Sequence, residues 1–87
     1  MITFYLTSDT SSGKKELFVM RAESGTHETK SGPFYAHNVA WRQCENAAHA
    51  AAERRGMNAE YTVTPEDVAV QAQENGTPAS SAAWVVS

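Results

Sequence analysis

The chain has 87 residues, 41% of them hydrophobic and 20% charged, and a net charge of −3 at pH 7. Many of the hydrophobic positions are alanine, so we expect one small folded domain, residues 1–87, with a thin core. Ten acidic against seven basic residues disfavour a protein that binds nucleic-acid phosphates, which requires a basic surface.

An antiparallel hairpin is expected at the start of the chain. Apolar and polar side chains alternate over residues 2–7, which is the period of a half-buried strand and not the pattern of a signal peptide. The polar stretch 8–15 ends this strand. Residues 16–22 form a second strand with apolar side chains on both faces, which favours a central position in the sheet. A third, weaker strand is expected over residues 26–30.

A long amphipathic helix is expected over residues 36–55. At about 100° per residue, Trp41, Cys44 and five alanines fall in one arc, and polar residues fall opposite. Trp41 is the one large apolar side chain of that arc, so we expect it to be a core anchor. Gly56 suits a left-handed helix cap. Two starts remain open, one at residues 31–33, where Pro33 suits the first helical turn, and one at residues 35–36.

The remaining chain is expected to add strands to the sheet. Residues 60–64 and 82–86 are rich in β-branched and aromatic side chains, which are typical of strands. Residues 65–74 fit a short second helix that follows Thr64, and they also fit a strand, because Asn75-Gly76 is a hairpin signal. The prediction is therefore an α+β fold with a small antiparallel sheet, made of the N-terminal hairpin and C-terminal strands, packed against one long alanine-rich helix.

The sequence offers little catalytic chemistry, and we expect no enzymatic activity, no cofactor and no metal. His37 and Cys44 lie two helical turns apart, about 10 Å, which is too far for a base and its nucleophile. The histidines and Cys44 have no spacing typical of a zinc site. Gly13-Lys14 lacks the earlier glycine and the following helix of a phosphate-binding loop.

This order of elements, a leading hairpin over residues 2–22, an alanine-rich helix over residues 36–55 and a short β-rich tail, resembles small bacteriophage accessory proteins of the anti-CRISPR type. The resemblance covers the whole chain in layout and rests on no diagnostic motif. It implies a compact, non-enzymatic inhibitor that occupies a surface of a bacterial defence complex, in the cytoplasm of a bacterial host.

We therefore expect a protein-binding module that acts by steric occlusion of a larger complex. Interface energy concentrates in aromatic and arginine side chains, so the polar helix face and the exposed loops are the candidate contacts. The candidate residues are Arg42, Glu45, Asn46, His49, Glu53, Tyr5, Lys14 and Lys15. Two alternatives stay open: a small RNA- or DNA-binding αβ domain, and a structural protein that self-associates, for example as a homodimer. No apolar run has the length of a membrane span, so we expect no membrane partner.

Overall fold

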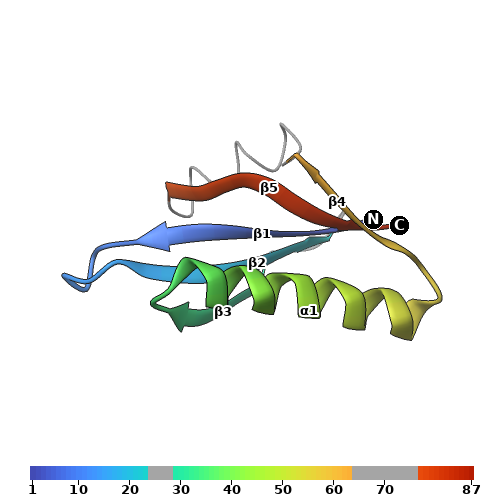
Figure 1. The fold of residues 1–87 in the computed structure, drawn as a ribbon, viewed down its shortest axis with the longest axis horizontal. Coiled ribbons are helices and arrows are strands. Elements are labelled where there is room, and N and C mark those ends of the chain that lie inside the picture. The colour runs from blue at the N-terminus through green and yellow to red at the C-terminus, as the bar shows by residue number, and fades with distance from the viewer. Residues whose placement is uncertain (24–28, 64–76) are drawn as a thin grey trace.

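The computed structural model describes residues 1–23, 29–63 and 77–87 as a five-stranded antiparallel sheet packed against one helix. In chain order the elements are β1 (Ile2–Asp9), β2 (Glu16–Glu23), β3 (Thr29–Phe34), α1 (His37–Arg55), β4 (Ala59–Val63) and β5 (Thr77–Val86). The strand order is β3-β2-β1-β5-β4, and α1 lies along one face of the sheet (Figure 1). The predicted α+β fold class is therefore confirmed.

β1 is the middle strand of the sheet. It pairs with β2 as the predicted hairpin, from Ile2 opposite Glu23 to Asp9 opposite Glu16, and with β5 on its other side. β2 is interior as expected, but β1 and not β2 holds the central place. The alternation in β1 suggested one buried face, whereas the side chains on both of its faces are buried over residues 2–7.

The core between α1 and the sheet combines large strand side chains with small helix side chains. The strands supply Ile2, Phe4, Leu6, Leu17, Val19 and Val86, and the helix supplies Ala40, Cys44, Ala48, Ala51 and Ala52. Small side chains let the helix backbone lie close to the strands, and burial of the apolar strand side chains then stabilises the pair. The predicted apolar arc of the helix is confirmed.

Trp41 lies at the margin of this core. It packs against the buried cluster, as the expected core anchor should, but it is only half-buried. Trp41 stands at the edge of the buried arc of α1, and its large indole ring lies at the flank of the helix, against Tyr61 of β4.

The helix begins and ends at local backbone signals. It starts at His37 after Ala36, the later of the two predicted starts, and ends at Gly56, whose φ of 63° is left-handed. Residues 31–33 belong to β3 instead. A bulge between β2 and β3 lies there, and Gly32 has a φ of 140°. The strand signal in β3 is weak because its side chains are mostly exposed.

The remaining boundaries differ from the predictions by a few residues. β3 begins at Thr29, β4 covers Ala59–Val63 against the expected 60–64, and β5 begins at Thr77, five residues before the expected start. The ambiguous segment 65–74 lies outside the described residues. No helix in the described ranges is long and apolar enough to cross a membrane.

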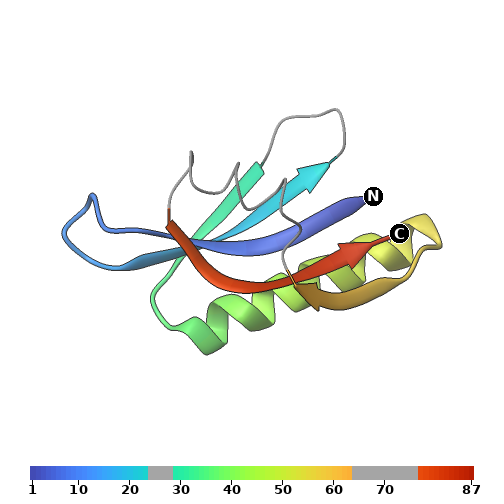
Figure 2. The ribbon, with the colours of Figure 1, turned by 90° about the horizontal axis from the view of Figure 1, so that it is seen from above.

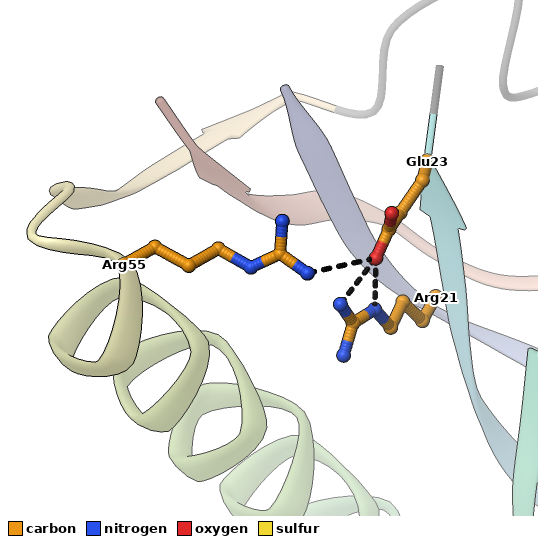
Figure 3. Close-up of polar contacts among 3 residues, drawn as sticks. All are labelled: Arg21, Glu23 and Arg55. Carbon is orange, nitrogen blue, oxygen red and sulfur yellow. Dashed lines mark hydrogen bonds and ion pairs between the residues drawn. The ribbon is translucent and has the colours of Figure 1, made fainter. Parts of the chain in front are cut away.

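An ion-pair cluster ties the end of the helix to the sheet (Figure 3). Glu23 on β2 accepts hydrogen bonds from Arg21, with Nε at 2.8 Å, and Arg55 of α1 approaches the same carboxylate oxygen to 3.4 Å. The Arg21 guanidinium also lies 5.7 Å from the ring centre of Phe4. These charges cover the end of the core where the apolar side chains of β2 stop.

Replacing Gly32 with alanine should destabilise the protein more than replacing Gly13. Both glycines have positive φ, 140° and 88°, so each variant pays a backbone cost of about 1 kcal/mol or more. A Cβ at Gly32 would in addition lie 2.9 Å from the Leu17 carbonyl oxygen, whereas a Cβ at Gly13 meets nothing within 4 Å. Urea unfolding should give the lower midpoint for Gly32→Ala, and equal midpoints would contradict the β2–β3 geometry.

Replacing Glu23 with glutamine should reduce stability at neutral pH and matter less in acid. The Arg21 hydrogen bond, together with the charges of Arg21 and Arg55, holds the pKa of Glu23 below its usual 4.5. A lowered pKa in the folded state gives stability that is present above the unfolded pKa and is lost as the pH falls through the folded one. Urea midpoints of parent and variant should therefore converge on acidification. A difference between the two urea midpoints that does not change with pH would contradict the ion-pair cluster of Arg21, Glu23 and Arg55.

Candidate functional site

The outer face of α1 presents most of the polar residues that the sequence singled out. Arg42, Asn46, His49 and Glu53 are exposed, and Glu45 is half-buried on the flank of the helix. Glu45 and His49 stand one turn apart, with Oε1 and Nε2 at 4.0 Å. Exposed pairs of this kind add little stability, so these side chains are free to change partners.

An aromatic row runs from this helix flank across to the edge of the sheet. We define the aromatic row as Trp41 and His49 of α1, Tyr61 of β4 and Trp84 of β5. The rings of Trp41 and Tyr61, and those of Tyr61 and Trp84, meet edge to face with centroids 5.8 Å apart. His49 lies over Trp84 at 5.0 Å. The row is therefore continuous through ring contacts.

The backbone places these rings side by side. Trp41, Glu45 and His49 follow one another at i, i+4 spacing, so they share the flank of the helix. On the sheet, Tyr61 lies directly opposite Trp84, which is itself opposite Phe4 of the central strand. Residues opposite one another in an antiparallel sheet share a face, so both rings lie on the side that α1 covers.

The row is accessible at its β4 end. The Tyr61 side chain is 63% exposed, and Val63, two residues further along the same face of β4, is 72% exposed. Trp84 is half-buried, and its indole Nε1 is buried without a hydrogen-bond acceptor in the described part of the chain. Exposed aromatic and apolar side chains next to polar ones are typical of protein interfaces.

The two candidate lysines lie elsewhere. Lys14 and Lys15 are exposed in the β1–β2 loop, which projects past the beginning of α1 in both views (Figures 1 and 2). The loop is ordered by a turn in which Asp9 Oδ1 accepts the Ser11 amide at 2.8 Å. That hydrogen bond is the main reason why the pKa of Asp9 is lowered. The loop and the helix face are thus separate surfaces.

Tyr5 is not a contact residue, and this prediction is wrong. The side chain is 1% exposed because it stands in the middle strand, on the face away from α1, and packs with Met20 and Ala83. Phe18 and Ala22 border this second cluster. The sequence pattern of β1 gave no sign that the second face of the sheet is buried.

Cys44 has the environment of a core side chain. It is fully buried among the helix alanines, and burial, helped by the charge of Glu45, raises the pKa of its thiol to about 12. A thiol with so high a pKa is a poor nucleophile at neutral pH. Within the described ranges, no three histidine, cysteine or acidic side chains are grouped so that they could hold a metal ion.

No family model, curated protein or solved structure matches this chain. The candidates named from the sequence include the helix residues of the surface described above but not Tyr61, Val63 or Trp84. The available signal was the alternation of Ala59, Tyr61 and Val63, which places three apolar side chains on one face of a short strand.

Proposed function

We propose that this chain is a non-enzymatic protein-binding module whose contact surface is the outer face of α1 together with the aromatic row. The observation that supports the proposal is the continuity of exposed Tyr61 with the half-buried Trp41 and Trp84, next to Arg42. Tyrosine, tryptophan and arginine are the residues in which binding energy concentrates at interfaces. A partner that buries this row would contact one apolar strip with a polar border.

The rival functions have less support from the same surface. An RNA- or DNA-binding domain needs a cluster of basic side chains. Among the described residues, Arg42 is the one exposed basic side chain in the middle of α1, beside the aromatic row. Lys14 and Lys15 lie in the separate hairpin loop. A catalytic function needs a nucleophile with a base in reach, and the Cys44 thiol is buried with a pKa near 12.

The narrower proposal is that the module inhibits a larger bacterial defence complex by steric occlusion, from within the host cytoplasm. It rests on the likeness in layout to anti-CRISPR proteins. Occlusion requires only that a small rigid body covers a functional surface of its target, and a helix fixed on a five-stranded sheet suits that role.

Exchanging the charges at two helix positions tests the surface. Arg42→Glu combined with Glu45→Arg keeps the net charge at −3 and changes side chains that are exposed or half-buried, so folding should be preserved. The variant should weaken a partner that docks on this face by about 1 kcal/mol or more, which is roughly fivefold in affinity. Affinity capture from a bacterial lysate, quantified by mass spectrometry, gives the measurement.

The matched control removes the charges of the hairpin loop with Lys14→Gln and Lys15→Gln. The loop variant should retain the captured protein, whereas the helix variant should lose it. The opposite pattern would move the interface to the loop. Tight, salt-sensitive binding of the purified protein to RNA or DNA, with no other protein present, would contradict the protein-binding proposal itself.

A further inference from the structure

The two edges of the sheet differ in how well they are protected against pairing. The β3 edge carries Lys30, Gly32 and Pro33 and pairs with β2 through a bulge. Charged side chains, proline and bulges are the devices that keep an edge strand from pairing with another chain. β4 carries one charged side chain, Glu60, but it has no proline, glycine or bulge between Ala59 and Val63, and among the described residues it pairs with β5 alone.

The register identifies which backbone groups of β4 face outward. Asn58 and Ser87 exchange both backbone hydrogen bonds, each at 3.0 Å, so they form a hydrogen-bonded pair. Hydrogen-bonded and non-hydrogen-bonded pairs alternate along an antiparallel ladder. Glu60 and Thr62 therefore direct their N–H and C=O groups to β5. The other three residues, Ala59, Tyr61 and Val63, direct theirs away from the sheet.

We propose that β4 pairs with β4 of a second copy of this chain, antiparallel and centred on Tyr61, so that two sheets join into one of ten strands. The three outward-facing residues are spaced symmetrically about Tyr61. In this register Tyr61 pairs with its own copy and Ala59 pairs with Val63. Each of the three residues then exchanges both backbone hydrogen bonds, which satisfies every outward N–H and C=O group of β4.

The side chains of β4 match this register on both faces. On the α1 side, the exposed Tyr61 and Val63 of each copy meet Tyr61 and Ala59 of the other, so the apolar strip is covered by an equally apolar one. On the opposite face each Glu60 stands across from a Thr62. A register centred on Glu60 would place the two carboxylates directly opposite each other, which is unfavourable. The strand is thus self-complementary in hydrogen bonding, apolarity and charge.

The pairing covers Tyr61, the exposed end of the aromatic row, so in the dimer a protein partner would contact the α1 part of the surface proposed above. The pairing uses the backbone edge of β4, whereas the charge exchange at Arg42 and Glu45 acts on the outer face of α1. The two-fold axis stands perpendicular to the joined sheet, so both helices lie on the same side of it. A protein partner would then meet two copies of the outer face of α1 on one side of the joined sheet.

Two substitutions at one position test the register. Thr62→Glu places a glutamate opposite Glu60 twice in each dimer, and Thr62→Lys places a lysine there. Like charges oppose pairing and opposite charges favour it, so the dimer dissociation constants should differ by about tenfold, with the lysine variant tighter. Sedimentation equilibrium over a concentration series measures both constants, and high salt should bring them together.

A charge swap provides the rescue. Glu60→Lys combined with Thr62→Glu restores opposite charges across the interface and should return the dissociation constant toward that of the parent. Circular dichroism of each variant confirms that the fold is kept. A parent that stays monomeric at the highest attainable concentration would overturn the proposal. So would a dimer whose dissociation constant is the same in the Thr62→Glu and Thr62→Lys variants.

The two proposals fail in different ways. If the Thr62 variants shift the dimer as expected while the Arg42 and Glu45 exchange has no effect on any captured protein, the paired edge stands and the helix face is not a binding surface. If the parent is monomeric but the Arg42 and Glu45 exchange abolishes capture, the helix face is a binding surface and the β4 edge does not pair.

Discussion

The close approach of α1 to the sheet is the constraint on which the rest of the structure depends. Ala40, Ala48 and Ala51 are fully buried and leave room only for strand side chains such as Phe4 and Leu6. A helix that packs through alanines buries less apolar surface per residue than one that packs through leucines. The large strand side chains therefore provide most of the buried apolar area of the core. Trp41, at the edge of the buried arc, is only half-buried.

Trp41 is placed at the helix flank, where it meets Tyr61 and, through it, Trp84. Three of the eight Phe, Tyr and Trp side chains are thereby gathered beside one edge of the sheet. Tyr61 remains mostly exposed there. Packing thus leads from a thin core to an accessible aromatic row, which is the proposed interface. Binding a partner or a second copy would bury side chains that the fold cannot bury by itself.

The sequence predicted the hairpin, the long helix and its buried arc because their periodicity is regular over many residues. It did not predict the middle place of β1, since the pairing of β1 with β5 joins the two ends of the chain. The burial of Tyr5 was missed for the same reason. On the helix, the exposed candidates Arg42, Asn46 and His49 could be assigned from spacing. The contact of His49 with Trp84 could not, because it depends on how the helix lies over the sheet.

Amide hydrogen exchange in β4, compared between dilute and concentrated solutions, distinguishes an open β4 edge from one paired with a second copy. In dilute solution the Thr62 amide, bonded to β5, should exchange slowly, whereas the outward Tyr61 amide should exchange fast. At high concentration the Tyr61 amide should become protected as the edge pairs. A Tyr61 amide that is already protected in dilute solution, or one that exchanges equally fast at both concentrations, would contradict the account.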